Sequence, residues 1–564
     1  MPKLLRNAGL ALLFVSFLLP GHYSPWATFE SQAAAALGVG LVGLGAALSC
    51  AQAGQRVPWP ALAMLAVATA AIPAAQFASG QIVFFSDALL PALYLVGFGL
   101  AVITGTVWAR NAPGTWLDLL FLALGAAAMV SVALALLQWL SIEAAGMWVV
   151  ALKSGMRPYA NLAQPNHLAT LLALGAVGLW RSYERRQIGG PVAGLAMGWL
   201  GFGLVMTQSR TGWLFVLLLL VWWATMRRRT ALRTPAPAVL TAAALLAAAI
   251  VLWEPLNEAL LLQAGGTLSQ RLQAGPRGLM WQTMLEAVAR SPWLGYGWNQ
   301  VIAAQQAVAV DMPPVRRMIE SAHNVVLDLA LWAGMPLALI WVAAVGAWLV
   351  AQTRRCANAD AWAVLAAIGA LLLHAQFEYP LEYAFFLLPL GLLMGTLSVS
   401  VVQPGPSSSP CRTVAWPLLL LPVASMLVAL GAIATEYLRV EQASRDVRMQ
   451  LAGFGAASAR HVAPPDVALL DGPREYHRLM ITPAREGMSI AELNWMRKVT
   501  QRYAFPPAML RYALAAGLNG REAEASRTLH TLCAIHLEPR CEEARATWRS
   551  AQQQWPRLIA VPAP

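Results

Sequence analysis

Residues 254–328 read EPLNEALLLQAGGTLSQRLQAGPRGLMWQTMLEAVARSPWLGYGWNQVIAAQQAVAVDMPPVRRMIESAHNVVLD, and they form the longest weakly hydrophobic segment inside an otherwise apolar series. The segment ends in Ser321-Ala322-His323-Asn324, and apolar sequence resumes at Val325. A loop of about 70 residues between two membrane-length apolar runs is far longer than most connections, and such loops usually carry function. We therefore expect the flanking helices to position this loop.

The composition is that of an integral membrane protein. Of the 564 residues, 58% are hydrophobic and 12% are charged, and the mean hydropathy is +0.56. Soluble domains usually carry about 25% charged residues. Apolar runs of about 17–25 residues recur, which predicts helical spans rather than the alternating segments of a β-barrel. The formal charge of +12 indicates basic loops on one side of a membrane, not nucleic acid binding.

The apolar runs predict an all-α polytopic membrane protein with about thirteen transmembrane helices, a large periplasmic loop and a C-terminal soluble helical domain. We interpret the first run as a retained helix, because no clear small-residue cleavage site follows it. The expected spans are residues 5–20, 33–53, 60–78, 88–109, 116–141, 165–181, 191–207, 212–226, 237–253, 325–351, 361–377, 383–402 and 415–436.

Basic residues predict the orientation of these spans. The short loops near 21–32, 79–87 and 378–382 hold no Lys or Arg. Basic loops stay cytoplasmic, so these three loops are expected in the periplasm of a bacterial inner membrane. With a cytoplasmic N-terminus the following residues fall on the other side: Arg56, Arg110, Arg181, Arg185, Arg186, Arg227, Arg228, Arg229, Arg233, Arg354, Arg355 and Arg412.

Composition divides the chain into four regions. The N-terminal transmembrane helices with short periplasmic motifs cover 1–253, the large periplasmic loop with the active site covers 254–324, and further transmembrane helices cover 325–440. In the last region, 441–564, Arg, Glu, Gln and Ser increase and membrane-length runs cease. We interpret this region as a periplasmic helical tail, in which one helix-turn-helix at 507–548 weakly indicates a tetratricopeptide-like repeat.

Two cysteines of the tail, Cys533 and Cys541, lie eight residues apart. In an oxidising compartment they are placed to form a disulfide. Two ordinary buried thiols are the alternative interpretation, and the sequence leaves both open.

Three arginines are candidates for binding phosphate, because a guanidinium stays charged and binds phosphate oxygens bidentately. Arg210 lies where two apolar spans meet, in a tight Ser-Arg-Thr-Gly turn, and Arg271 and Arg277 lie in the large loop. Arg277 and Trp281 are expected to share a helix face. A snorkelling arginine that anchors a helix end is the structural alternative for Arg210.

His323 is the candidate base, because histidine accepts a proton near neutral pH. A capping or packing role is the alternative for a single histidine. No His-x-x-x-His or Cys-x-x-Cys pattern is present, so we expect no metal site. In the last periplasmic loop, Glu378 is expected to orient nearby groups.

The segment Gln164-Pro165-Asn166-His167 opens an apolar run. Proline suits the first turn of a helix, and the amides offer neutral donors and acceptors. A simple capping segment is the alternative interpretation.

Most of the membrane region resembles the bacterial general protein O-oligosaccharyltransferases, the pilin-glycosylating members of the O-antigen ligase and polymerase superfamily. Glu382 departs from the His or Trp that the family has at that position. The resemblance rests on these motifs: His22, Pro25-Trp26 and Phe29; Asn161 with Gln164-Pro165-Asn166-His167; Ser209-Arg210-Thr211-Gly212; Arg277 with Trp281; Ser291 to Gly297; Ala322-His323-Asn324; and Glu378 to Tyr383.

The resemblance implies a metal-independent and cofactor-free transfer of oligosaccharide from undecaprenyl-pyrophosphate in the membrane to Ser or Thr hydroxyls of a periplasmic, pilin-like protein. It implies that His323 is catalytic and that the arginines bind the pyrophosphate. Residues that would position the substrates are Gln164, Asn166, His167, Asn324, Trp281, Glu378 and Tyr383.

Other functions remain as alternatives. An O-antigen ligase would use the same donor with lipid A-core as acceptor, and a glycan polymerase is a further variant. A transporter or flippase of lipid-linked sugars belongs to another class. Transporters usually place ionisable residues within their spans and show internal repeats, whereas the centres of most runs here carry almost no charge.

Overall fold

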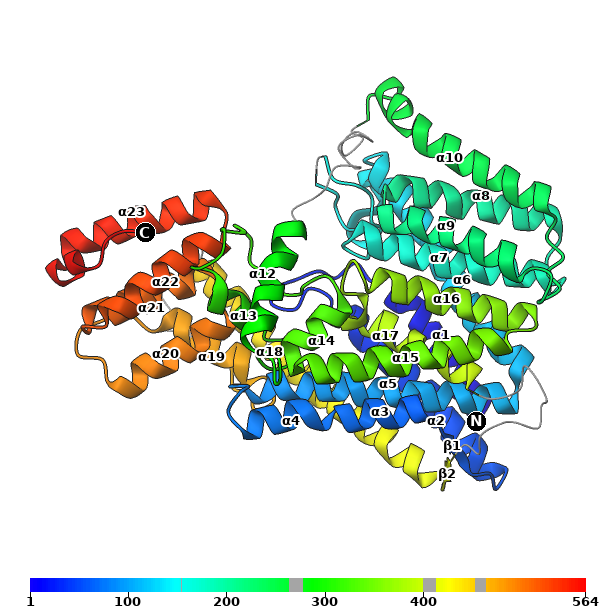
Figure 1. The fold of residues 1–564 in the computed structure, drawn as a ribbon, viewed down its shortest axis with the longest axis horizontal. Coiled ribbons are helices and arrows are strands. Elements are labelled where there is room, and N and C mark those ends of the chain that lie inside the picture. Colours follow the sequence, from blue (N-terminus) through cyan, green and yellow to red (C-terminus); the bar gives the residue numbers. More distant parts are fainter. Residues whose placement is uncertain (154, 263–276, 399–411, 452–462) are drawn as a thin grey trace. The chain divides into compact units, whose positions relative to one another are not determined.

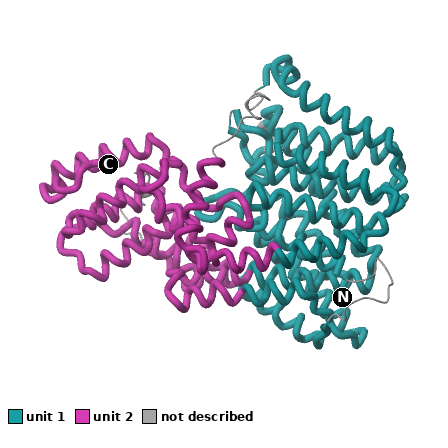
Figure 2. Tube along the Cα trace, viewed as in Figure 1, with its two compact units in different colours: residues 1–69, 94–273, 343–431 teal, residues 70–93, 274–342, 432–564 magenta. Residues whose placement is uncertain are grey.

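The structure is a computed structural model, and it describes residues 1–153, 155–262, 277–398, 412–451 and 463–564. Apart from one short ribbon, these residues form helices and their connections (Figure 1). They group into two compact units, which are coloured separately in Figure 2. Unit 1 comprises residues 1–69, 94–273 and 343–431, and unit 2 comprises residues 70–93, 274–342 and 432–564.

Unit 1 holds most of the apolar helices. Its elements are α1 (Pro2–Ser16), α2 (Phe29–Gln52), β1 (Val57–Trp59), α3 (Ala61–Thr69), α6 (Pro113–Trp139), η1 (Glu143–Trp148), α7 (Pro165–Glu184), α8 (Gly190–Thr207), α9 (Arg210–Met226), α10 (Ala236–Ala259), α16 (Ala359–His374), η2 (Pro380–Glu382), α17 (Ala384–Leu397) and β2 (Arg412–Val414).

Unit 2 combines large-loop helices with the tail. Its elements are α4 (Ala71–Ala78), α12 (Arg277–Arg290), α13 (Val301–Val308), α14 (Val325–Ala333), α19 (Asp471–Ile481), α20 (Ile490–Arg502), α21 (Pro506–Leu518), α22 (Glu522–Ile535), α23 (Glu538–Gln554) and η5 (Pro556–Ala560). Three helices contribute to both units: α5 (Phe85–Asn111), α15 (Met335–Arg355) and α18 (Pro417–Leu451).

By length and composition, eight of the described helices can cross a membrane. They are Phe29–Gln52, Ala61–Ala78 (α3 and α4 taken together), Phe85–Asn111, Pro113–Trp139, Gly190–Thr207, Ala236–Ala259, Met335–Arg355 and Pro417–Met449. The helices α9, α16 and α17 are also apolar but shorter. The all-α, multi-pass architecture is therefore confirmed, whereas the number of about thirteen spans and the soluble nature of the tail stay predictions.

Small residues let the helices of unit 1 approach closely. A Cβ atom added to Gly9 of α1 would lie 2.3 Å from the backbone oxygen of Gly38 in α2. Membrane helices use small residues in this way, because van der Waals packing rather than the hydrophobic effect joins them. The α1–α2 pair thus depends on glycine at the contact.

A two-stranded ribbon, which the sequence did not predict, ties two distant connections of unit 1 together. Strand β1 pairs antiparallel with β2, with Val57 opposite Val414. The Arg56 guanidinium donates to the backbone oxygen of Thr413 at 2.9 Å. Because Arg56 and Arg412 were both expected on cytoplasmic loops, the ribbon is consistent with a shared side for these loops.

Arg181, which was expected in a cytoplasmic loop, lies instead within α7 and is fully buried. Its guanidinium donates to Asp118 and to Asp360, both at 2.7 Å. Arg185 adds a contact to Asp360 at 3.2 Å. These ion pairs connect α7 with α6 and α16, so part of the positive charge has a structural role.

The predicted span 325–351 is wrong as a single helix, because the chain breaks at Gly334 between α14 and α15. Gly334 has φ +85°, and a Cβ atom there would lie 2.1 Å from the backbone oxygen of Trp293. The segment Ser291 to Gly297 fills the break: Tyr296 donates its backbone N–H to Leu331 at 2.7 Å, and Met335 donates to Pro292 at 2.8 Å. Helix ends leave backbone groups unpaired, and this segment pairs them.

The tail helices of unit 2 share one apolar core. The turn after Leu518 joins α21 to α22 within the predicted helix-turn-helix at 507–548, and these two helices pack together (Figure 1). Fully buried members of the core include Met496, Leu529 and Trp548, and burying such a side chain contributes about 1.5–3 kcal/mol. A second cluster packs Ile302 of α13 against the tail helices, so the large loop and the tail meet within unit 2.

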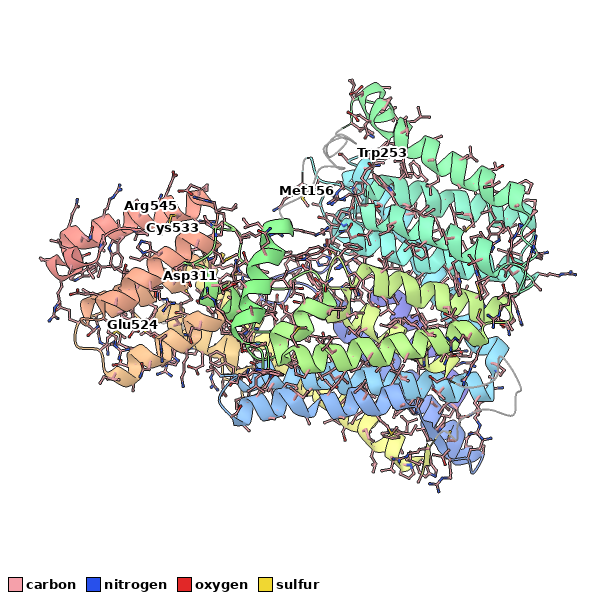
Figure 3. All side chains as sticks on the ribbon, in the orientation of Figure 1. Met156, Trp253, Asp311, Glu524, Cys533 and Arg545 are labelled. Carbon is pink, nitrogen blue, oxygen red and sulfur yellow. A yellow bond between two sulfur atoms is a disulfide. The ribbon has the colours of Figure 1, made fainter. Side chains whose placement is uncertain are left out.

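Cys533 and Cys541 form a disulfide between α22 and α23, with Cα atoms 4.7 Å apart. Figure 3 labels Cys533 on α22 and Arg545 on the neighbouring α23. The disulfide interpretation is thus supported over that of two separate thiols.

Candidate active site

His323 lies in a short loop of unit 2 whose backbone is held on several sides. Its φ of +53° is in the left-handed region, and its backbone N–H donates to the Ser321 hydroxyl at 3.1 Å. The side chain of Asn324 caps α14 by accepting from the backbone N–H groups of Val326 and Leu327. A non-glycine residue in this conformation is uncommon and is held by its surroundings.

Asp328, which the sequence analysis did not select, anchors this loop. Its side chain is buried, and it accepts the Ser321 hydroxyl at 2.8 Å and the backbone N–H of Ala322 at 2.7 Å. Both donors precede His323, so the carboxylate folds the chain back on the start of α14. The exact partners are visible only once the loop is folded, although an acid inside an apolar run was an available signal.

Trp281 connects α12 to the same loop. Its indole N–H donates to the backbone oxygen of Ala322 at 2.9 Å. Arg277 is the first residue of α12, one turn before Trp281, so these residues share a helix face as predicted. Within unit 2, the helix that carries Arg277 is therefore directly bonded to the His323 loop.

Two of the three arginines predicted to bind phosphate lie within the described residues. Arg271 lies outside the described residues, Arg277 belongs to unit 2, and Arg210 belongs to unit 1. Arg210 is the exposed first residue of α9 rather than part of a free turn. The joint binding of phosphate by these arginines stays a prediction.

A polar network in unit 1 joins three of the predicted periplasmic motifs. The Ser209 hydroxyl caps α9 and donates to Asn166 Oδ1 at 2.7 Å. Asn166 Nδ2 donates to the buried Glu378 carboxylate at 2.9 Å. The structure thus brings Asn166 and Glu378 together beside the N-terminus of the helix that Arg210 begins.

His167 lies deep in unit 1 and is 2% exposed. Aromatic rings surround it, with the Tyr383 ring centroid at 4.7 Å and the Phe386 centroid at 5.6 Å. The structure therefore brings the predicted positioning residues His167 and Tyr383 into contact. Such burial favours a packing or positioning role for His167 over a direct catalytic one.

Gln164 precedes α7, and Pro165 occupies the first helical turn as expected. The side-chain oxygen of Gln164 is buried and has no hydrogen-bond partner among the described residues. Buried polar atoms are nearly always paired, so this oxygen is suited to a donor from water or substrate.

Gln138 and Asn161 position the loop before Gln164, and the sequence analysis did not assign them roles. Gln138 accepts the backbone N–H groups of Tyr159 and Ala160 at 3.0 and 2.8 Å. The Asn161 amide donates to the backbone oxygen of Leu18 at 2.7 Å. A fully satisfied buried network of this kind fixes a unique loop conformation.

Arg157 is a further residue that sequence reasoning missed. Its guanidinium donates to the backbone oxygens of Thr207 and Gln208 at 3.2 and 3.1 Å. These carbonyls end α8 immediately before the Ser209-Arg210 segment. Arg157 therefore holds the turn that leads into Arg210.

The His22 ring contacts two backbone oxygens. Its Nδ1 lies 3.1 Å from the backbone oxygen of Ala27, and its Nε2 lies 2.8 Å from that of Asn161. With both ring nitrogens beside backbone oxygens, His22 joins the first loop to the Asn161 segment, which favours a structural role.

Each unit carries groups suited to group transfer. In unit 2, the half-buried His323 imidazole is a candidate proton acceptor, and Arg277 is a candidate for neutralising a phosphate. In unit 1, Arg210 is a second candidate of that kind. Neutral amides and a carboxylate beside Arg210 can orient a polar substrate.

Three family profiles match the chain in sequence. The profile described as "Protein glycosylation ligase" matches residues 158–180, "O-Antigen ligase" matches 195–342, and "Virulence factor membrane-bound polymerase, C-terminal" matches 362–551. The matched ranges contain Asn166, Arg210 and His323.

Two curated proteins of Acinetobacter baylyi are similar over long stretches. A "General O-oligosaccharyltransferase" is 29% identical over 550 residues, covering 93% of this chain and 91% of that protein. A "ComP-specific O-oligosaccharyltransferase" is 26% identical over 336 residues, covering 58% and 60% of the two chains.

The fold, the site and these similarities define a multi-pass membrane glycosyltransferase. More specifically, the chain is an oligosaccharyltransferase, similar to O-antigen ligases over residues 195–342 and to protein glycosylation ligases over residues 158–180.

Proposed function

We propose that this enzyme transfers an oligosaccharide from undecaprenyl-pyrophosphate to Ser or Thr hydroxyls of a periplasmic acceptor protein such as a pilin. The observation that carries the proposal is the bond from Trp281 to the backbone oxygen of Ala322. It joins the helix of Arg277 to the loop of His323, so a phosphate-binding group and a base lie on directly connected elements.

In this mechanism His323 acts as the general base. The acceptor oxygen attacks the anomeric carbon of the first sugar, and its proton passes to the imidazole. The bond from that carbon to the phosphate oxygen breaks, and the polyprenyl-pyrophosphate leaves with the electron pair. An alcohol is a poor nucleophile at neutral pH, so proton removal is the demanding step.

Arg210 and Arg277 are proposed to bind the pyrophosphate and to neutralise the charge that develops on it. This leaving group needs charge neutralisation rather than protonation, and guanidinium groups remain charged throughout. The reaction would accordingly be metal-independent. Arg271 is proposed to take part on the sequence argument alone.

The remaining predicted residues are proposed to position the substrates. Trp281 and Asn324 hold the His323 loop and the start of α14, while Gln164 offers its buried oxygen. Asn166 and Glu378 would orient the sugar or phosphate beside Arg210. His167 and Tyr383 pack behind this network.

The active site is proposed to face the periplasm of a bacterial inner membrane. Two observations support this orientation. Arginines concentrate on the loops expected in the cytoplasm, as the positive-inside rule requires. The disulfide between Cys533 and Cys541 is of a kind that persists in oxidising compartments.

A lipopolysaccharide O-antigen ligase is the second candidate, since residues 195–342 match the O-antigen ligase profile. The match of residues 158–180 to a protein glycosylation ligase favours a protein acceptor. Both curated relatives are named as transferases, which favours an enzyme over a transporter of lipid-linked sugars.

Expression in a ligase-deleted bacterial host that makes a lipid-linked glycan and a candidate pilin tests the proposal. We expect glycan on the pilin, detected by mass spectrometry, and none on lipid A-core. The reverse distribution would establish the second candidate, and glycan on neither acceptor at normal enzyme level would contradict both.

A further inference from the structure

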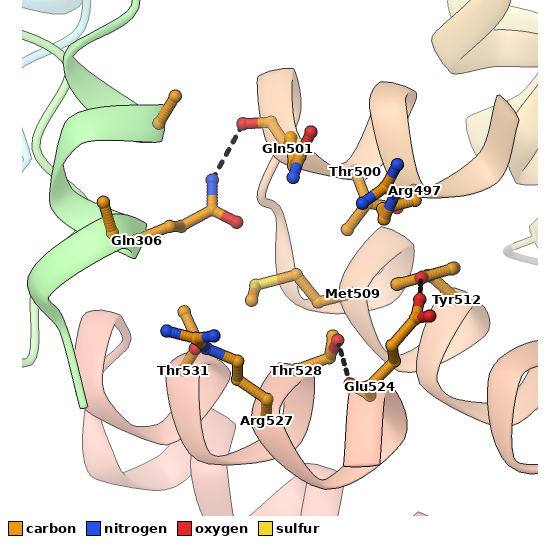
Figure 4. A pocket seen from close by; sticks show the side chains of 12 residues that line it. Gln306, Arg497, Thr500, Gln501, Met509, Tyr512, Glu524, Arg527, Thr528 and Thr531 are labelled. Atoms are coloured by element: carbon orange, nitrogen blue, oxygen red, sulfur yellow. Dashed lines mark hydrogen bonds between the residues drawn. The ribbon is translucent and has the colours of Figure 1, made fainter. Parts of the chain in front are cut away.

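A cavity of about 380 Å³ lies in unit 2 between α13 of the large loop and the tail helices α20, α21 and α22 (Figure 4). Its volume is within the range of ligand-binding sites. None of its lining residues takes part in the chemistry proposed above. Both charged and apolar side chains line the cavity, and they indicate the class of ligand that it would bind.

The charged lining is positive on balance. Arg497 of α20 and Arg527 of α22 both line the cavity, and within the described residues neither forms an ion pair. The carboxylate that lines it, Glu524, accepts the Tyr512 hydroxyl and pairs with Arg521 at 3.3 Å. Two guanidinium groups therefore remain for an anionic partner, and carboxylates are bound bidentately by arginine.

A buried hydroxyl in the cavity wall also lacks a partner. Thr500 of α20 is 3% exposed, and its Oγ has no hydrogen-bond partner among the described residues. Helical threonines commonly bond to the carbonyl one turn earlier, as Thr528 does to Glu524 at 2.7 Å. An unpaired buried hydroxyl calls for a water molecule or a ligand group.

The other lining groups favour a peptide over a sugar. The aromatic residue of the cavity, Tyr512, is 3% exposed and its hydroxyl is already bonded, so it offers little ring surface for a sugar to stack on. The Gln501 side-chain amide and the side-chain oxygen of Gln306, whose Nε2 donates to the backbone oxygen of Gln501 at 2.8 Å, suit peptide backbone groups. Met509 provides an adaptable apolar contact.

We propose that this cavity binds an acidic, extended segment of the acceptor protein, with an Asp or Glu side chain between Arg497 and Arg527. The inference rests on the proposed function, because it assumes a protein acceptor. Holding the acceptor at a second point raises the effective concentration of its hydroxyl at the catalytic site. The enzyme would thus select acceptors by a feature separate from the modified residue.

Fluorescence anisotropy on the full-length enzyme in lipid nanodiscs tests whether the cavity binds an acidic peptide. The probe is a labelled short peptide of alternating Glu and Ser, compared with its Gln-Ser counterpart and with an oligosaccharide of glucuronic acid. The test variant combines Arg497→Glu with Arg527→Glu. The control combines Lys498→Glu with Arg549→Glu, which changes the net charge equally at two exposed positions that do not line the cavity.

We expect the acidic peptide to bind the wild type, and the test variant to weaken binding about tenfold or more. The control variant should retain nearly full affinity. Arg497→Gln with Arg527→Gln provides a milder test if thermal unfolding shows that the charge reversal disturbs the fold. Equal peptide binding by wild type and test variant would overturn the proposal, as would tighter binding of the acidic oligosaccharide than of the peptide.

Transfer kinetics separate this inference from the proposed function. With an acceptor that carries an acidic segment, the test variant should raise KM about tenfold while kcat stays near the wild-type value. Active transfer with an unchanged KM would contradict the cavity assignment alone. Arginine-dependent peptide binding without any glycan transfer would instead contradict the proposed function.

Discussion

His323 adopts a backbone conformation that disfavours most side chains. Its φ of +53° costs about 1 kcal/mol or more for a non-glycine residue, and Ser321, Asp328 and Trp281 stabilise it through bonds to the loop. Such strain is common where a side chain must be held at a fixed place. The arrangement fits a residue whose imidazole has a catalytic role.

Replacing His323 with Ala should abolish most transfer, with a loss of roughly 10²–10⁴-fold in kcat, because the acceptor hydroxyl would lose its base. Protein level and donor binding should persist, and glycan transfer to a purified acceptor measures the effect. His22→Ala serves as the comparison and should cost much less. Near wild-type transfer by His323→Ala, together with loss in His167→Ala, would reverse the assigned roles.

Asp328→Asn should lower kcat by about 10-fold to 100-fold, because small misplacements of a catalytic group are costly. The amide keeps the shape but replaces one acceptor oxygen with a donor, so one of the bonds to Ser321 or Ala322 is lost. KM for the acceptor should change little, and steady-state kinetics separate the two parameters.

The double variant Asp328→Asn with Ser321→Ala provides the control. If both residues act through the His323 loop, the two losses should be less than additive. Purely additive losses, or a large fall in thermal stability with unchanged kcat, would mean that Asp328 only supports the fold.

Sequence patterns select His323 and the Arg277–Trp281 pair as candidates, because these residues fall in a long polar loop with recognisable spacing. The role of Asp328 was not predictable in the same way. It lies inside a run that hydropathy assigns to a span, and its partners precede it. Only the folded loop brings the carboxylate to Ser321 and Ala322.

At the scale of elements, hydropathy did not predict the break between α14 and α15. An apolar run of sufficient length predicts one span, and glycine is frequent in membrane helices. Gly334 therefore gave no signal by itself. Glycine is required at position 334 because a Cβ atom there would lie 2.1 Å from the backbone oxygen of Trp293, and this contact is visible only in the folded chain.

Gly334→Ala should destabilise this junction by about 1–3 kcal/mol, because a side chain at φ +85° is strained and meets the Trp293 carbonyl. Thermal unfolding in detergent and glycan transfer should both decrease. Gly346→Ala in the middle of α15 is a matched control, since a Cβ atom there meets nothing within 4 Å. Equal stability of both variants would contradict the packing argument.

Arg181 shows a second limit of sequence reasoning. The predicted orientation counts it as a cytoplasmic charge, yet its pairs with Asp118 and Asp360 also join three helices. The two aspartates are distant in sequence, so no local pattern connects them. Charge asymmetry predicts sidedness, whereas the partners of each charge depend on tertiary packing.

At the scale of the whole molecule, the all-α architecture followed from composition and run length. The ribbon between β1 and β2 could not be predicted, because its strands are short and far apart in sequence. The sequence also did not predict that the large-loop helices group with the tail in unit 2. This grouping depends on contacts such as those of Ile302 with the tail helices.

Reporter fusions test the predicted orientation. A reporter that is active only in the periplasm should be active when fused after Ser291 or at the C-terminus, because both follow an odd number of predicted spans. Fusions after Arg229 or Arg355 should be silent, as basic loops stay in the cytoplasm. A silent C-terminal fusion would require a different number of spans.

The helices α10 and α16 of unit 1 differ in burial, and this difference predicts different tolerance to substitution. Few residues of α10 are buried, whereas most of α16 is enclosed by neighbouring helices. Lipid selects only for apolar character, but a packed interior also selects for volume and shape. Across homologous enzymes, positions of α10 should therefore exchange Leu, Ala, Val and Ile with little constraint. In a scan of single substitutions, α16 should reject many of the same exchanges.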